Sequence, residues 1–250
     1  MGRGFRRKYA TAKSWDARRR RRFAGKTGKC LYNRADGIVG SDRGHKRFDT
    51  DLAKGQDMVF TLRIGAQAPD FNLPGVDGRH YALRNFKAAP VLVIVFSCNH
   101  CPFVIGSEDR LKALYRKYGP RGVAIVAINS NETTHHPDDS FDHMVTRAKK
   151  DALPWVYVRD ESQDVARTYG ALRTPHFYVF DSSRRLRYTG RMDDNPHEAA
   201  KATTHELADA LDALLAGQEP PVTLTNPIGC NVKWIGQDAH WMPPEACDLV

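Results

Sequence analysis

The chain has 250 residues, 41% of them hydrophobic, so it is long enough to bury a sizeable core. Its net charge of +9 is uneven, because residues 1–57 hold 17 of the 38 Lys and Arg but only 6 of the 29 Asp and Glu. The rest of the chain is nearly neutral, which excludes a basic nucleic-acid-binding domain there. Its longest apolar run, residues 88–96, has only the length of a strand, which excludes a transmembrane helix.

Residues 1–57 show neither a helical nor a strand period, and they are predicted to form a disordered basic tail. A solvated tail is favoured over a nucleic-acid-binding segment, since no aromatic residues are interleaved with the basic ones. The sequence from Met58 onward is typical of a protein start, so the tail is alternatively explained by a misplaced start codon. No apolar stretch follows the basic cluster, so a cytoplasmic location is expected, with a mitochondrial presequence as the alternative.

Residues 58–217 are predicted to form one domain. Two short strands, at residues 69–73 and 80–83, are separated by turn residues 75–78 and predict a hairpin at the start of this domain. The apolar, β-branched run Val91–Phe96 predicts a strand that is covered on both faces.

Strands and helices then alternate along the chain. Helices are predicted near residues 103–118, from Asp138 and Asp139 onward, at 162–169 and at 196–216, and strands at 123–128, 155–158, 177–180 and 186–189. The last two strands are expected to pair antiparallel. This order predicts an α/β fold with a mixed central sheet and helices on both faces.

The motif Cys98-Asn99-His100-Cys101 lies between the first buried strand and the helix that follows it. If that helix begins at Cys98, its free amides and dipole stabilise a thiolate there and lower the pKa of the thiol. Cys101, one turn further on, would then resolve the mixed disulfide left on Cys98. The context of strand, Cys-x-x-Cys, Pro102 and helix therefore predicts catalytic redox thiols.

Two other uses of these cysteines are disfavoured by the sequence. A structural zinc site needs two more ligands, and the chain has no second Cys-x-x-Cys or Cys-x-x-His, so no metal is expected. Two unreactive buried cysteines are disfavoured at a helix start beside a polar Asn-His pair. The odd number of five cysteines also favours a reducing compartment with catalytic rather than structural thiols.

The sequence resembles the thioredoxin superfamily, and within it the peroxiredoxin-like redoxin branch. The resemblance covers about residues 64–215 and rests on four segments, which are residues 65–73, 77–78, 96–102 and 174–177. It implies a thioredoxin-like fold in which a cis proline, matched by Pro175 after Thr174, faces the cysteines and offers backbone groups to a substrate. It also implies that His100, which matches the histidine of disulfide isomerases, stabilises the thiolate and makes the couple more oxidising than thioredoxin; a solvent-facing His100 without effect is the alternative.

The chain departs from the patterns of these families at several positions. Leu92 stands where thioredoxins carry a buried Asp that assists proton transfer, so a different acceptor, or water, must serve. Val95 and Val91 stand where peroxiredoxins place the Thr and Pro of their peroxide site, which weakens the expectation of peroxide reduction. Ser97 replaces the Trp that precedes the first cysteine in thioredoxins.

Weaker signals lie at Arg173 and in a C-terminal extension, residues 218–250. Arg173 either holds a thiolate or an acidic substrate, or is an ordinary solvated arginine. In the extension, Cys230 is a possible third redox thiol, although packing of Trp234 onto the domain is the favoured role of this segment. Cys30 and Cys247 lie in polar segments and are expected to be incidental.

The leading interpretation is a thiol-disulfide oxidoreductase that uses the Cys98–Cys101 couple, with no cofactor. Its expected partners are a disulfide-bearing protein, or a small-molecule disulfide or peroxide, and an external thiol reductant. A peroxiredoxin-like peroxidase with Cys98 as the peroxidatic residue is one alternative. A redox-sensing interaction module without turnover is the other.

Overall fold

The computed structural model describes residues 61–242. The predictions for the basic tail at residues 1–57, for the start at Met58, and for Cys30 and Cys247 lie outside these residues. Every structural statement below refers to this part of the chain.

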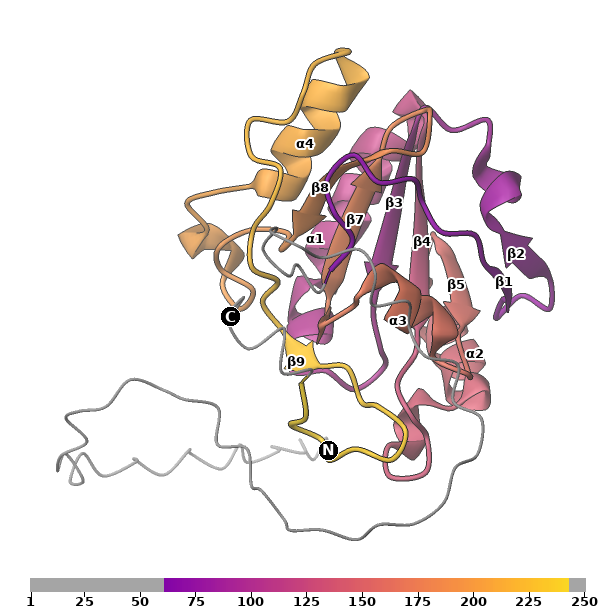
Figure 1. Cartoon of the computed structure of the whole chain (residues 1–250). Helices are drawn as coiled ribbons and strands as arrows, with labels where there is room; N and C mark the ends of the chain where they lie inside the picture. The colour runs from indigo at the N-terminus through magenta and orange to yellow at the C-terminus, as the bar shows by residue number, and fades with distance from the viewer. Residues whose placement is uncertain (1–60, 243–250) are drawn as a thin grey trace, which may run out of the picture. The chain divides into compact units, whose positions relative to one another are not determined.

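A five-stranded mixed sheet forms the centre of the domain, in the order β5-β4-β3-β7-β8 (Figure 1). Three strands are parallel, while β7 pairs antiparallel with β3 and β8 pairs antiparallel with β7. The bounds are β3 Val91–Phe96, β4 Val123–Asn129, β5 Val156–Arg159, β7 His176–Phe180 and β8 Leu186–Gly190. All six residues of β3 are buried, as their continuous apolar sequence predicts for a central strand.

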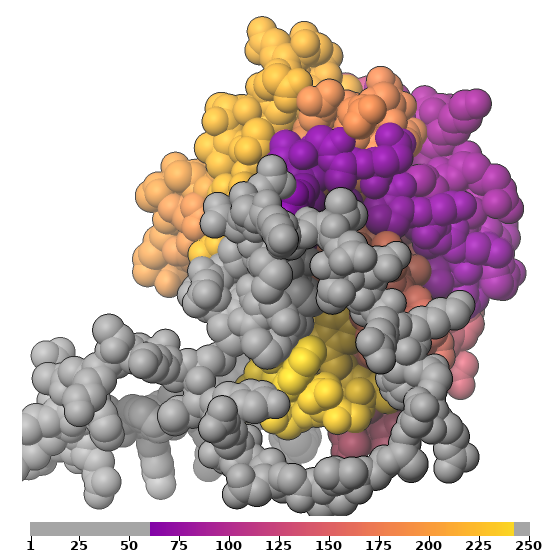
Figure 2. Space-filling model, in the orientation of Figure 1, coloured from indigo at the N-terminus to yellow at the C-terminus, as the bar shows by residue number. Residues whose placement is uncertain are grey.

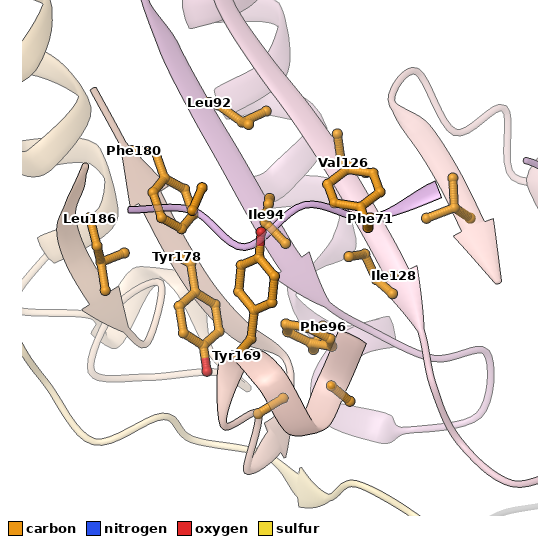
Figure 3. Packing of buried hydrophobic residues seen from close by; sticks show 14 of the residues in the cluster. Phe71, Leu92, Ile94, Phe96, Val126, Ile128, Tyr169, Tyr178, Phe180 and Leu186 are labelled. Atoms are coloured by element: carbon orange, nitrogen blue, oxygen red, sulfur yellow. The ribbon is translucent and has the colours of Figure 1, made fainter. Parts of the chain in front are cut away.

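Helices cover both faces of this sheet. Alternate residues of β3 point to opposite sides, so Leu92, Ile94 and Phe96 join one core cluster and Val91, Val93 and Val95 the other. The first cluster is closed by α3 (Asp164–Tyr169) and by Phe71 from the start of the domain (Figure 3). The second is closed by α1 (Pro102–Tyr118), α2 (Phe141–Lys150) and α4 (Glu206–Leu215).

The predicted N-terminal hairpin is present. Strands β1 (Asn72–Pro74) and β2 (His80–Ala82) pair antiparallel across a turn in which Gly78 has a φ of 82°, a conformation that glycine adopts easily. Short 3₁₀ turns complete the domain at Leu83–Phe86, Gly119–Arg121, Pro137–Asp139 and Ala199–Lys201. The mixed α/β architecture and the thioredoxin-like fold are therefore confirmed. None of the described helices is long and apolar enough to cross a membrane.

One predicted helix start and one predicted position are wrong. The helix after β3 begins at Pro102, close to the predicted start near residue 103, but its N-cap is Cys101, so Cys98 lies in the preceding loop and not at the helix terminus as predicted. The last helix begins at Glu206 instead of residue 196. Side chains hold the intervening backbone in other conformations, because Arg110 donates to the carbonyls of Asn195 and Pro196 and Asp194 accepts from the amides of Thr203 and Thr204.

The described part of the C-terminal extension packs onto the domain. Its strand β9 (Cys230–Asn231) pairs antiparallel with β6 (Arg173–Thr174). Val232 and Trp234 are buried in the same core cluster as Phe96, which agrees with the predicted packing role of Trp234. Figure 2 shows part of this segment as a yellow surface at one end of the domain, the end at which Figure 1 places β9.

Candidate active site

The two cysteines of the motif converge on the residue that precedes the cis proline. The Thr174–Pro175 peptide bond is cis, as predicted. Sγ of Cys101 lies 3.0 Å from the carbonyl oxygen of Thr174, and Sγ of Cys98 lies 3.5 Å from its hydroxyl oxygen. Both thiols are reduced and fully buried. The structure therefore brings together Cys98, Cys101, Thr174 and Pro175 as the sequence predicts.

A third thiol adjoins this pair. Cys230, on β9, is opposite Thr174 in the strand register and packs with Cys98, Cys101 and Val104. The thiol and the backbone N–H of Cys230 both lower the pKa of Cys101. Cys230 is partly exposed, so it is the most accessible of the three sulfur atoms.

The pKa values of the two motif thiols are shifted in opposite directions. Burial raises the pKa of Cys98, and the neighbouring Cys101 sulfur and the Asp139 carboxylate act in the same direction. The pKa of Cys101 is lowered by four hydrogen-bond donors, which are the thiols of Cys98 and Cys230 and the backbone N–H groups of Cys230 and Val104. Burial of Cys101 acts in the opposite direction, but these donors outweigh it. The lowered pKa that the sequence predicts for Cys98 is therefore found at Cys101, mainly because the Cys98 thiol donates to its sulfur.

A buried carboxylate lies beside the motif. Asp139, at the end of a 3₁₀ turn before α2, has no exposed surface, and its oxygens accept from the backbone N–H of Asn99 at 2.6 Å and from the side chains of Asn131 at 2.8 Å and Asn129 at 3.2 Å. Burial acts to raise the pKa of Asp139, but the hydrogen bonds and the charge of His100 outweigh it and lower that pKa. Asp139 is therefore held as an anion.

His100 is the partner of this anion. Its Nδ1 lies 2.8 Å from Oδ2 of Asp139, in an ion pair that lacks the alignment of a hydrogen bond. The carboxylate raises the pKa of His100, although partial burial acts against it. The ring stacks on His136 at 5.2 Å, and burial together with the charge of His100 lowers the pKa of His136. His100 is therefore anchored and favoured as a cation, not a solvent-facing residue without contacts.

Sequence reasoning missed the residues that position the motif. The sequence predicts Asp139 only as part of a helix start, although Leu92 stands at the position of the buried Asp of thioredoxins. Arg147, from α2, donates to the carbonyl of Cys98 at 2.8 Å, and Tyr157, from β5, donates to the side chain of Asn99 at 2.9 Å. Each of these residues lies far from the motif in sequence, so no local pattern could have identified it.

Three potential metal ligands meet at the same place. Sγ of Cys98, a ring nitrogen of His100 and a carboxylate oxygen of Asp139 all lie within 4.8 Å of one another. However, the oxygens of Asp139 already accept several hydrogen bonds, and His100 is paired with it. A bound metal would have to displace these contacts, so the arrangement fits proton transfer better than metal binding.

Arg173 does not contact the motif thiols. Its guanidinium donates to the carbonyl of Gly229 at 3.0 Å and to Oδ1 of Asn231 at 2.8 Å. It is therefore neither an ordinary solvated arginine nor, in this structure, a ligand of a thiolate. Its side chain holds the extension against β6.

The fold, the cis proline and the paired thiols define a thiol redox protein with a thioredoxin-like fold. More specifically, the chain belongs to the Redoxin family, whose family model matches residues 63–210. The strand β9 and Cys230 lie beyond the matched residues.

Curated relatives carry two kinds of thiol activity in their names. The chloroplastic peroxiredoxin Q of Oryza sativa subsp. japonica is 26% identical over 131 residues, which are 50% of this chain and 57% of that protein. The thiol-disulfide oxidoreductase ResA of Bacillus cereus is 25% identical over 127 residues, which are 50% of this chain and 68% of that protein. The chain thus matches little more than half of the rice relative.

Solved structures of higher identity cover more of the chain. An uncharacterized conserved protein from Geobacillus kaustophilus is 40% identical with a TM-score of 0.66, over 70% of this chain and 94% of that one. A hypothetical protein from Sinorhizobium meliloti 1021 is 36% identical with a TM-score of 0.67, over 71% and 97% of the two chains. Together these comparisons support a thiol redox function without deciding between its two forms.

Proposed function

We propose that the chain is a thiol-disulfide oxidoreductase in which Cys98 and Cys101 cycle between a dithiol and a disulfide. The observation that carries this proposal is the convergence of both sulfur atoms on Thr174, at 3.0 Å and 3.5 Å. The dithiol itself carries the two electrons, so no cofactor is needed. The expected substrates are disulfide-bearing proteins or small disulfides, and an external thiol, most abundant in the cytoplasm where we place this chain, returns the electrons.

The lowered pKa of Cys101 favours Cys101 as the attacking thiol of the pair. The Cys101 thiolate attacks a substrate sulfur, forms a mixed disulfide and releases the other substrate sulfur as a thiolate. Cys98 then loses its proton and attacks Sγ of Cys101, which forms the Cys98–Cys101 disulfide and releases the second substrate thiol. The substrate has gained two electrons and the protein has lost two. This order reverses the one expected from the sequence.

Asp139 and His100 are suited to receive the proton of Cys98. They lie within 4.8 Å of its sulfur, where Leu92 leaves no carboxylate of the thioredoxin type. His100 accepts this proton in its neutral form, after releasing its own to water through a ring that is 28% exposed, and the Asp139 anion favours the uptake. The pair therefore replaces the buried Asp that the sequence lacks.

A peroxidase is the second candidate, and the similarity to peroxiredoxin Q favours it. In that case Cys98 would attack peroxide, become a sulfenic acid and condense with Cys101. The raised pKa of Cys98 argues against this, because the thiolate is the attacking species. A redox sensor that does not turn over is the remaining alternative.

Turnover assays separate the three functions. The full chain should catalyse reduction of insulin disulfides by dithiothreitol, and both Cys98→Ser and Cys101→Ser should abolish this catalysis. Asp138→Asn, an exposed change next to Asp139, is the matched control and should retain it. Peroxide consumption without insulin reduction would establish the peroxidase. A Cys98–Cys101 disulfide that forms without turnover on either substrate would establish the sensor.

A further inference from the structure

Strand β9 occupies the edge along which a thioredoxin-like site presents backbone groups beside its cis proline. In the register, Arg173 is opposite Asn231 and Thr174 is opposite Cys230. The pairing continues past the strand, where the N–H of Val232 donates to the carbonyl of Leu172 at 3.1 Å. The extension is therefore an added strand of the kind that an extended peptide forms on a free sheet edge.

The segment fits this edge closely. A Cβ atom on Gly229 would lie 2.2 Å from the carbonyl oxygen of Thr174 and 3.0 Å from the nitrogen of Pro175, so only glycine allows the approach. Arg173 holds both sides of the contact through Gly229 and Asn231. Cys230 is thus placed where the cysteine of a bound disulfide substrate would lie.

Burial of the three thiols decreases from Cys98 and Cys101, which have no exposed surface, to Cys230, which is partly exposed. The thiol of Cys230 contacts Cys101, and β9 covers the pair from the side of the cis proline. A reagent that reaches the pair from this side meets Cys230 first.

We propose that Cys230 is a third redox-active cysteine, which exchanges disulfides with Cys101 and carries electrons between external thiols and the buried pair. The proposal rests on the Cys98–Cys101 chemistry put forward above. Starting from the oxidised pair, the Cys230 thiolate attacks Sγ of Cys101, forms a Cys101–Cys230 disulfide and releases Cys98, which takes up a proton. An external thiolate then attacks Sγ of Cys230 and releases the Cys101 thiolate, and a second external thiol frees Cys230. The net result is one protein disulfide reduced and one external disulfide formed.

The charges around Cys230 favour this direction of exchange. In the reduced protein, burial and the nearby Cys101 sulfur raise the pKa of Cys230 to about 11, so it stays protonated. When Cys101 is in a disulfide its negative charge is gone, while Lys233 and Arg173 still favour a Cys230 thiolate. Cys101, whose own pKa is lowered, is a good leaving group when Cys230 is attacked. Cys230 is therefore activated mainly in the oxidised state.

The first experiment traps the new disulfide. The background is the full chain with Cys30→Ser and Cys247→Ser, which retains Cys98, Cys101 and Cys230. The Cys98→Ser variant of this background is oxidised with oxidised glutathione and then digested for mass spectrometry. We expect a Cys101–Cys230 disulfide in nearly all molecules, and its loss in Cys98→Ser with Cys230→Ser. Recovery of Cys101 and Cys230 as separate thiols, glutathione adducts or intermolecular dimers would overturn the proposal.

The second experiment measures the rate at which reduced glutathione reduces the Cys98–Cys101 disulfide in the same background. We expect Cys230→Ser to slow this reduction about tenfold, because the external thiol must then reach a buried sulfur directly. Ile235→Ala, an exposed change in the same extension, should leave the rate unchanged. An unchanged rate in Cys230→Ser refutes the role of Cys230 alone, whereas failure of the Cys98–Cys101 disulfide to form at all refutes the proposed function.

Discussion

The carboxylate of Asp139 lies 2.8 Å from Nδ1 of His100 and is fully buried, while the histidine ring is 28% exposed. A buried anion thus lies next to a partly exposed cation, which is the third residue of the redox motif. Asp139 links the 3₁₀ turn Pro137–Asp139 to the motif, because it also accepts from the backbone N–H of Asn99. The strength of the Asp139–His100 ion pair should therefore affect both the stability of the protein and the redox potential of the motif.

Asp139→Asn should destabilise the protein in a pH-dependent manner. The lowered pKa of Asp139 contributes stability that is present above its unfolded value of 3.8 and lost as the pH falls through the folded pKa. The raised pKa of His100 contributes stability that is present below 6.5 and lost as the pH rises through its folded pKa. The difference between wild type and Asp139→Asn, about 2 to 3 kcal/mol, should therefore be largest between these two values. Urea unfolding across pH measures it, with Asp138→Asn as control, and a pH-independent difference would contradict the assignment.

The sequence predicted the fold well because its elements are encoded locally. The run Val91–Phe96 could only be a buried strand, and the cis proline followed from the resemblance at Thr174 and Pro175. The start of α1 at Pro102 agrees with the predicted start near residue 103, but the position of Cys98 could not be predicted, since the motif can form either the first turn of the helix or the loop before it. The roles of Asp139 and Cys230 were not predicted because Asp139 joins the site through a contact 40 residues away in the sequence, and Cys230 joins it through the pairing of β9 with β6.

The thiolate of the reduced protein should be found on Cys101. In the chain with Cys30→Ser and Cys247→Ser, thiolate absorbance in the ultraviolet should titrate well below the range of free cysteine. This acidic titration should persist in Cys98→Ser, although shifted upward because one donor is changed, and disappear in Cys101→Ser. Loss of the acidic titration in Cys98→Ser alone would restore the order of attack predicted from the sequence.

His100 should make the couple more oxidising than thioredoxin. A cationic ring near the Cys101 sulfur stabilises the thiolate, and hence the reduced state. We expect a midpoint above about −270 mV for the wild type and a decrease of about 30 mV in His100→Ala, which corresponds to about 1.4 kcal/mol for two electrons. A glutathione redox titration with thiol trapping gives both values, and His135→Ala, an exposed change, serves as control. Equal midpoints in wild type and His100→Ala would remove this role.

Gly229→Ala should loosen the strand that covers the thiols. The added methyl group would overlap the Thr174 carbonyl, which is backbone and cannot move aside, so β9 must shift away from β6. Alkylation of Cys101 should then be faster than in the wild type. Gly119→Ala is the matched control, since its Cβ would meet Tyr115 at an ordinary 3.8 Å. If the two variants are alkylated at the same rate, β9 does not restrict access.

Trp234 should anchor the extension to the core. Its ring is 4% exposed, packs edge-on against Trp241 at 6.3 Å, and lies 5.3 Å beneath the guanidinium of Arg167. Backbone contacts on either side fix its position, because Gln163 donates to the carbonyl of Lys233 at 2.7 Å and accepts from the N–H of Ile235 at 2.9 Å. The ring therefore fills a defined site in the core cluster that also holds Phe96 and Tyr169.

Trp234→Ala should lower the free energy of unfolding by about 3 to 5 kcal/mol, as expected when a large buried aromatic side chain leaves a cavity. Ile235→Ala changes the next residue, whose side chain is 55% exposed, and should change stability by less than about 0.5 kcal/mol. Both values come from urea unfolding of the full chain followed by far-ultraviolet circular dichroism. Alkylation of Cys101 should also accelerate in Trp234→Ala and not in Ile235→Ala, because the anchor of β9 is lost only in the former. Equal stabilities of the two variants would mean that the extension rests on the domain without being part of its core.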